Sequence, residues 1–264
     1  MKTGRLEKVL LYDEGADPKL NMEETAEYLR GKLPRVPVEI RAAFPPSSPE
    51  EQRELARCLA AIKIADVTRN MTAEQEPLYG EIEFELRRIL GKTRAFGVIY
   101  DGIQLVRRFS ELIAPAERDF ALVHIFFTNR LFATWGSKDL RYHARTSVYG
   151  FPSVISTTGL VEAPAKPREY YLLKQQYEML GKDIQEVKEQ FTGSFIDYED
   201  ERLTEVVKGY AMQAVFYALN GDPFCEDRGC RLFNAHWQAD LIFAQLESGY
   251  EYCQRHSDFL SSFS

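Results

Sequence analysis

Residues 224–256 read FCEDRGCRLFNAHWQADLIFAQLESGYEYCQRH and hold three of the chain's four cysteines. Four residues separate Cys225 from Cys230, and His256 follows Cys253 by three positions. Thiolates and imidazoles are ligands that Zn²⁺ prefers, and four of them in a tetrahedron form a closed, structural site. Each pair is a short local chelate, and closing the one loop between the pairs costs an entropy that grows slowly with loop length. The spacing therefore predicts one structural zinc ion on Cys225, Cys230, Cys253 and His256.

Three other interpretations of this stretch stay open at the level of sequence. The cysteines can be reduced, buried thiols beside a surface histidine, because cysteine is a common core residue. Cys225 and Cys230 can instead form a disulfide. His236 can replace His256 as the fourth ligand in a C-x4-C-x5-H pattern, although the tighter C-x2-H chelate favours His256.

The composition is that of a globular protein, with 264 residues of which 45% are hydrophobic and 28% charged. The net charge of −7 argues against a nucleic-acid partner, because DNA binding needs a clustered positive surface. No stretch approaches the roughly 20 apolar residues that span a bilayer, so we expect no membrane association. The first apolar run is also too short for a signal peptide. These features predict a cytoplasmic protein, in which clustered cysteines more often bind metal than form disulfides.

Strand-like and helical segments alternate over residues 1–160, and helical segments dominate residues 161–264. The expected strands cover residues 8–12, 36–40, 95–100, 121–128, 141–149 and 154–157. Arg202 to Leu219 predicts a long helix that ends at Asn220-Gly221-Asp222-Pro223. Asn234 is expected to cap a C-terminal helix. This order predicts an α+β fold in one domain over residues 1–264.

Residues 202–230, RLTEVVKGYAMQAVFYALNGDPFCEDRGC, resemble the core of the archaemetzincins, a family of zinc-dependent metallopeptidases. The family pattern is H-E-x-x-H-x-x-G-x-x-H-C-x4-C-x-M, then, after a spacer, C-x-x-C. In that family the histidines hold a catalytic zinc and the cysteines hold a structural zinc. Gly221, Cys225 and Cys230 match the pattern, and Cys253 and His256 match the closing pair with one cysteine exchanged for histidine.

This resemblance implies a zincin-like mixed sheet, a long helix at the former active site and a retained structural zinc. Residues 154–160 look like the family's neighbour of the strand that lines the substrate cleft. The stretches TTGLVEAPAKPREYY (157–171) and CRLFNAHWQ (230–238) are also similar to a group of proteins labelled as metallopeptidases.

The catalytic half of the pattern is absent. The three histidine positions hold Ala214, Ala218 and Phe224, the glutamate position holds Val215, and no H-E-x-x-H occurs in the chain. Two histidines at i and i+4 can grip one ion from one helix face, whereas alanine offers no lone pair, so we expect this face to be hydrophobic core. A register shifted by one residue places Gln213 and Tyr217 at the first two ligand positions, where they can contact a bound ligand.

Three further residues are candidates for chemistry. His143 lies between Arg141 and Arg145 on an alternating strand, and the three can form a cationic face that binds a carboxylate or phosphate, or that is simply solvated. Glu162 is the acid that would serve catalysis if catalysis persists, although carboxylates are mostly exposed to water. His236 is the third candidate, as a member of a relocated site.

The sequence as a whole predicts a pseudoenzyme that keeps a structural zinc and binds a peptide, a protein or a small ligand in an inherited cleft. One alternative is an active metallohydrolase with a relocated site on His143, His236 and Glu162. Another is a scaffold subunit with a filled cleft.

Overall fold

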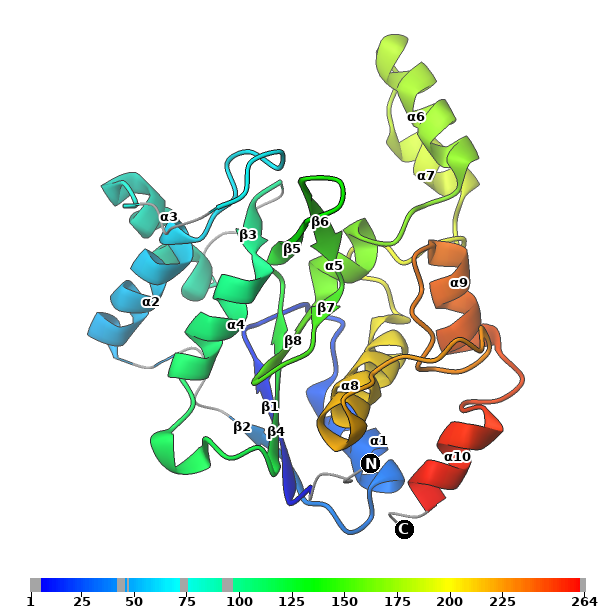
Figure 1. Ribbon diagram of the computed structural model, residues 1–264. Coiled ribbons are helices and arrows are strands. Elements are labelled where there is room, and N and C mark those ends of the chain that lie inside the picture. The colour runs from blue at the N-terminus through cyan, green and yellow to red at the C-terminus, as the bar shows by residue number, and fades with distance from the viewer. Residues whose placement is uncertain (1–5, 42–45, 47, 72–75, 92–96, 262–264) are drawn as a thin grey trace.

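The computed structural model describes residues 6–41, 46, 48–71, 76–91 and 97–261. Its larger sheet has five strands in the order β2-β1-β4-β8-β7 (Figure 1). β7 is antiparallel to β8, and the other neighbouring pairs are parallel, so the sheet is mixed as predicted. The strands are β1 (Lys8–Asp13), β2 (Val38–Arg41), β4 (Leu122–Thr128), β7 (Ser147–Val148) and β8 (Ser153–Ser156).

Helices pack on both faces of this sheet. The apolar run in β1 is typical of a parallel strand that is buried on both sides. Val9 and Leu11 pack in one core with α1 (Met22–Lys32) and α8 (Leu203–Asn220). Leu10 and Tyr12 point to the opposite face, as the two-residue period of a strand requires. That second core is closed by α2 (Pro49–Ala61), α3 (Tyr79–Ile89) and α4 (Gly102–Glu111).

A second, three-stranded sheet has the order β3-β5-β6. β3 (Ile99–Asp101) is parallel to β5 (Leu131–Gly136), and β5 is antiparallel to β6 (Arg141–Arg145). Arg130, between β4 and β5, is buried and forms ion pairs with Glu14 and Glu85. Because Glu14 follows β1 and Glu85 lies on α3, these ion pairs join the two sheets to a covering helix.

The last hundred residues are mainly helical, as the sequence predicts. Before this region there is also one short 3-10 helix, η1 (Pro115–Glu117), which precedes β4. The later elements are α5 (Thr157–Glu162), α6 (Arg168–Met179), α7 (Gln185–Gln190), α9 (Gln238–Ile242), the π-helix η2 (Phe243–Glu247) and α10 (Gln254–Ser261). α6 and α7 project from the body of the molecule and enclose a small core around Tyr170, Val187 and Phe195 (Figure 1). None of the described helices is long and apolar enough to cross a membrane.

Several expected segments are wrong in detail. The single strand expected over residues 141–149 is two strands in different sheets, β6 and β7, separated by Thr146. The strand expected over 154–157, and the strand-like stretch to 160 implied by the resemblance, end at Ser156. There the Ser156 hydroxyl accepts the Gly159 N–H at 2.8 Å and caps α5. The helix expected from Asn234 begins only at Gln238, because residues 233–237 are not helical and Trp237 pairs with Ala165. Residues 95–96 of another expected strand lie outside the described residues, and β3 begins at Ile99.

Candidate functional site

The four predicted metal ligands lie together in the structure. The ligand atoms of Cys225, Cys230, Cys253 and His256 are all within 4.8 Å of one another, and no second group of this kind occurs in the described part of the chain. Cys225 Sγ is 3.8 Å from Cys253 Sγ, and His256 Nδ1 is 3.2 Å from Cys253 Sγ and 3.5 Å from Cys230 Sγ. Zn–S bonds of about 2.3 Å and Zn–N bonds of about 2.0 Å in a tetrahedron separate ligand atoms by roughly 3.5–3.8 Å. The donor set therefore fits a tetrahedral ion, and none of the cysteines is bonded in a disulfide.

Local backbone structure preforms each half of this cluster. In the first half, the Asp227 N–H donates to Cys225 Sγ at 3.4 Å, and the Cys230 N–H donates to the Asp227 carbonyl at 3.0 Å. In the second half, the Cys253 carbonyl accepts the N–H groups of His256 and Ser257, each at 3.0 Å, in the first turn of α10. These hydrogen bonds join residues that are close in sequence and hold the two ligands of each pair near each other. Each pair is therefore a local chelate, as the spacing predicts.

Burial controls the charges of the cluster when no ion is bound. Burial raises the pKa of Cys225 and raises the pKa of Cys230 to about 12. Burial also lowers the pKa of His256, and the nearby Arg255 adds to this effect. These shifts favour the neutral forms of Cys225, Cys230 and His256 in the free site, and metal binding must release the protons of the two thiols.

The imidazole of His256 must also adjust to an ion. Its Nε2 is 3.2 Å from Arg255 Nη2, and arginine can only donate hydrogen bonds. This contact suits the tautomer that is protonated on Nδ1, the atom that faces the sulfurs. An ion bound through Nδ1 requires the other tautomer, and Arg255 cannot accept the proton that Nε2 then carries.

The helix ahead of the cluster, α8, carries no metal ligands at the positions of the archaemetzincin histidines. Ala214 and Val215 are fully buried in the core between α8 and the sheet. The expectation that the whole face is core is wrong at its C-terminal end. Ala218 is exposed and lines a cavity, and Phe224 lines another.

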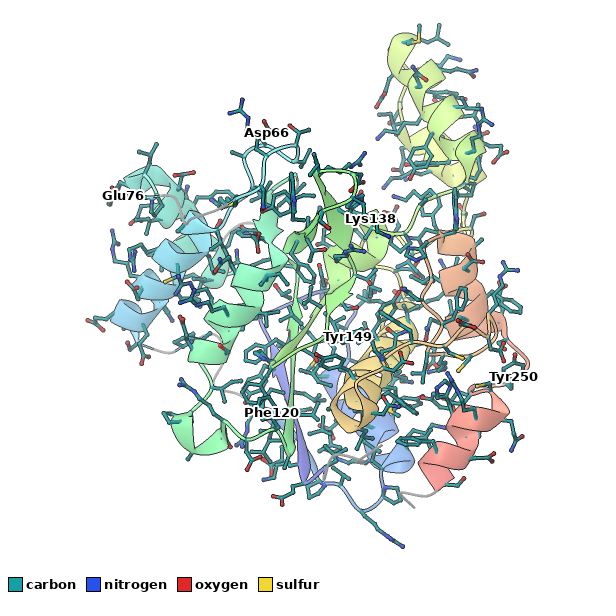
Figure 2. The ribbon with its side chains drawn as sticks, viewed as in Figure 1. Asp66, Glu76, Phe120, Lys138, Tyr149 and Tyr250 are labelled. Carbon is teal, nitrogen blue, oxygen red and sulfur yellow. The ribbon has the colours of Figure 1, made fainter. Side chains whose placement is uncertain are left out.

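Gln213 and Tyr217 lie on the side of α8 that faces Tyr149. The Tyr149 hydroxyl donates to Gln213 Oε1, and Gln213 Nε2 donates to the Phe233 carbonyl at 3.3 Å. Figure 2 shows Tyr149 next to the ribbon of α8. The Tyr149 ring is 6.2 Å from the Tyr217 ring and 5.8 Å from the Phe224 ring. Gln213 is 1% exposed and is engaged by the protein itself, so it positions Tyr149, whereas Tyr217 is free to touch a ligand.

A cavity of about 440 Å³ opens beside these aromatic rings. Its walls come from residues 144–149, in and beside β6 and β7, and from Thr134 of β5. The other walls come from Ala163 and Pro164 after α5, from the C-terminal end of α8 and the turn after it, and from residues 234–236. A second cavity of about 370 Å³, lined by Phe120, Phe151 and Ala218, shares Tyr217 with the first. The cleft therefore runs along both sides of Tyr217.

The three candidates for a relocated catalytic site do not come together. His143 Nε2 is 2.7 Å from Asp139 Oδ2 on the turn before β6. Glu162 ends α5 and accepts a hydrogen bond from the Tyr198 hydroxyl at 2.9 Å. His236 lines the larger cavity and is not a member of the cysteine cluster, so His256 is the histidine that the fold places there.

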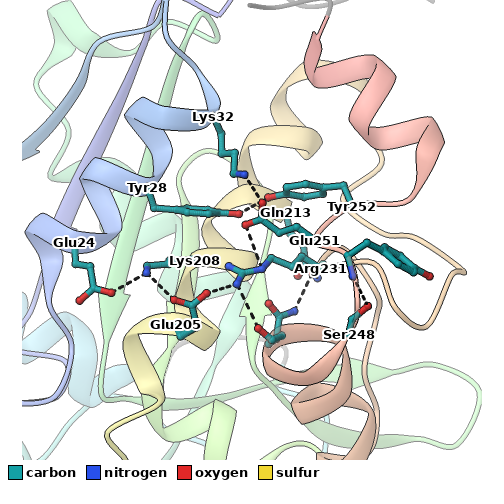
Figure 3. Close-up of polar contacts among 12 residues, drawn as sticks. Glu24, Tyr28, Lys32, Glu205, Lys208, Gln213, Arg231, Ser248, Glu251 and Tyr252 are labelled. Atoms are coloured by element: carbon teal, nitrogen blue, oxygen red, sulfur yellow. Dashed lines mark hydrogen bonds and ion pairs between the residues drawn. The ribbon is translucent and has the colours of Figure 1, made fainter.

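Sequence reasoning missed a network of charged residues between α1, α8 and the cluster (Figure 3). Lys208 contacts Glu24 and Glu205 at 2.7 and 2.6 Å, and Glu205 pairs with Arg231, which directly follows Cys230. Arg231 Nε is 3.5 Å from Glu251, and Glu251 pairs with Lys32 on α1. Opposite charges at positions 205 and 208 of one helix were the only local sign of this network.

Sequence reasoning also left the roles of Tyr149 and Arg145 open. Both line the larger cavity. They lie far in sequence from α8 and residues 234–236, so no short motif marks them.

No curated protein matches the chain. Two solved structures match most of it: archaemetzincin from Methanopyrus kandleri, at 13% identity and a TM-score of 0.46, covers 98% of this chain and 96% of its own. A zinc-dependent peptidase from Methanocorpusculum labreanum, at 12% identity and a TM-score of 0.48, covers 96% of this chain and 99% of its own. A family model described as "Probable metallopeptidase family (DUF6775)" matches residues 5–263. The chain therefore belongs to this probable metallopeptidase family.

Proposed function

We propose that this chain is a ligand-binding pseudoenzyme of its family, held by one structural zinc ion and lacking a catalytic one. The proposal rests on which side chains on and near α8 could act as metal ligands. The family's histidine positions hold Ala214, Ala218 and Phe224, and the described residues contain no group of potential ligands besides Cys225, Cys230, Cys253 and His256. A zinc ion there, closed by four protein ligands, cross-links two chain segments and leaves no open position for water or substrate.

The ligand we propose for the cleft is a peptide, either free or as part of a protein partner. β7 is the edge strand of the five-stranded sheet, and both its residues line the larger cavity. An extended peptide can pair with such an edge through main-chain hydrogen bonds. The rings of Tyr149, Tyr217 and Phe224 form an apolar wall for its side chains. A cytoplasmic location suits the proposal, because the four cysteines then stay reduced.

Elemental analysis of the purified protein, without added metal, tests the proposal. We expect one zinc ion per chain, retained in Cys58→Ser and His236→Ala, whose residues lie outside the cluster. We expect its loss in Cys253→Ser and His256→Ala. Two zinc ions per chain, or chelator-sensitive peptidase activity in the folded protein, would contradict the proposal. The wild-type measurement decides the stoichiometry even if a ligand variant fails to fold.

A further inference from the structure

The larger cavity is lined by cationic and uncharged residues. The chain carries a net charge of −7, yet none of the described residues that line the cavity is acidic. The lining residues include Arg145, His236 and Asn234. Thr134, Thr146, Ser147 and Tyr217 add hydroxyl-bearing side chains to the lining, whereas the Tyr149 hydroxyl is bonded to the buried Gln213.

Arg145 differs from the other cations on its strand. Arg141, His143 and Arg145 alternate along β6 and share one face, as the sequence predicts. His143 is engaged by Asp139, and Arg141 is exposed. Within the described chain, no carboxylate lies within ion-pair distance of Arg145, which is only partly exposed. Its charge is therefore available to a group that enters the cavity.

The side chain of Arg145 is already held in place. Its Nε donates to Thr134 Oγ1 at 2.7 Å, across β5 and β6, which leaves the two terminal nitrogens as a fork. The backbone is fixed as well, since α5 packs so closely that a Cβ on Gly159 would lie 2.3 Å from the Arg145 carbonyl oxygen. A preorganised guanidinium fork matches the two oxygens of a carboxylate or the oxygens of a phosphate.

We propose that this cavity binds an oxyanion through Arg145, and that the oxyanion is the terminal carboxylate of the peptide that lies in the cleft. This inference rests on the proposed function, because it assigns one end of the same ligand. The short edge of β7 supports the inference. It offers only a few main-chain hydrogen bonds to a peptide, and Arg145 can anchor the end of the peptide chain next to them. The aromatic wall then contacts the side chains that precede the carboxylate.

Paired peptide arrays test the inference. One array displays peptides with free C-terminal carboxylates, and the other displays the same sequences as C-terminal amides. We expect the full-length protein to bind the free-acid array more strongly, by about tenfold, because the amide removes one ion pair and one oxygen acceptor. Arg145→Gln should abolish the difference, and Arg145→Lys should restore it only in part, since lysine lacks the fork. Arg141→Gln, on the same face of the same strand, is the matched control and should behave as wild type.

Titration with inorganic phosphate separates the possible outcomes. In one outcome the protein binds phosphate, Arg145→Gln abolishes this binding, and no peptide binds. This result supports the oxyanion site with a small anion as its ligand, and it refutes peptide binding. Equal binding of acid and amide peptides, without Arg145-dependent phosphate binding, overturns the inference and leaves the peptide proposal intact. If neither peptides nor phosphate bind, both are wrong. Thermal unfolding of each variant establishes that it is folded.

Discussion

At the scale of single residues, Gln213 links the cysteine-rich segment to the cleft. Its amide oxygen accepts a hydrogen bond from the Tyr149 hydroxyl, and its amide nitrogen donates one to the Phe233 carbonyl. We expect Gln213→Leu to destabilise the protein by about 1–3 kcal/mol, because it leaves the partly buried Tyr149 hydroxyl and Phe233 carbonyl without their partner. Denaturant unfolding measures this change. Tyr149→Phe should cost less on its own, and the two losses should not add, because both variants break the same hydrogen bond.

His124 makes the stability depend on pH. The Tyr12 hydroxyl is 2.9 Å from His124 Nδ1, and the Glu117 carbonyl accepts from Nε2 at 3.0 Å, so the neutral ring satisfies both partners. Burial lowers the pKa of His124 below its ordinary value. Below about pH 6.5 the unfolded chain takes up a proton that the folded protein resists, so this residue removes stability as the pH falls.

The variant His124→Gln should therefore show a shallower fall in Tm between about pH 7.5 and about pH 5.5 than wild type. Thermal unfolding across this range is the measurement. The comparison cancels the contribution of His256, which both proteins share. An equal or steeper fall in the variant would show that His124 is not responsible.

At the scale of elements, the ion pairs of Arg130 hold the two sheets together. Arg130 is 1% exposed, Glu14 Oε1 lies 2.7 Å from its Nη2, and Glu85 and Tyr100 contact its Nη1. We expect Arg130→Met to cost about 3–5 kcal/mol, because the buried Glu14 loses its counter-charge and the buried Glu85 keeps only its ion pair with Lys63. The control is Lys174→Met on α6, whose exposed pair with Glu178 should contribute less than about 1 kcal/mol. Equal effects in urea unfolding would refute the role of Arg130.

The elements that sequence predicts well are those whose signal is local. β1, β4 and α8 follow from their own apolar patterns, and the two metal-ligand pairs follow from spacings of three and five positions. Residues 157–160 were assigned to a strand, and Thr157 and Thr158 do favour strands. Tertiary structure overrides that preference, since the cap from Ser156 and the close approach at Gly159 impose a helix. A cleft was expected, but most of the residues that line the cavity were not identified, because they come from segments that only the fold brings together.

At the scale of the whole molecule, the cysteine cluster joins parts of the chain that lie far apart in sequence and that also share the main core. The segment after α9 contributes Cys253 and His256, and it returns to the turn of Cys225 and Cys230 at the end of α8. The charged network of Figure 3 continues this junction to α1 through Arg231, Glu251 and Lys32. An ion at the cluster therefore stabilises the packing of the C-terminal segment on α8 and α1.

Removal of the ion should accordingly weaken the whole molecule. Structural zinc sites contribute about 10 kcal/mol or more at neutral pH, which is comparable to the total stability of an ordinary domain. We expect a chelator to lower the Tm strongly and added zinc to restore it, in wild type and equally in Cys58→Ser. Cys253→Ser should unfold at the temperature of the chelated wild type and should not respond to zinc. Elemental analysis must first establish that the chelator has removed the zinc. If the Tm is then unchanged, the core and the charged network hold the C-terminal segment without metal, and the structural role of the ion is refuted.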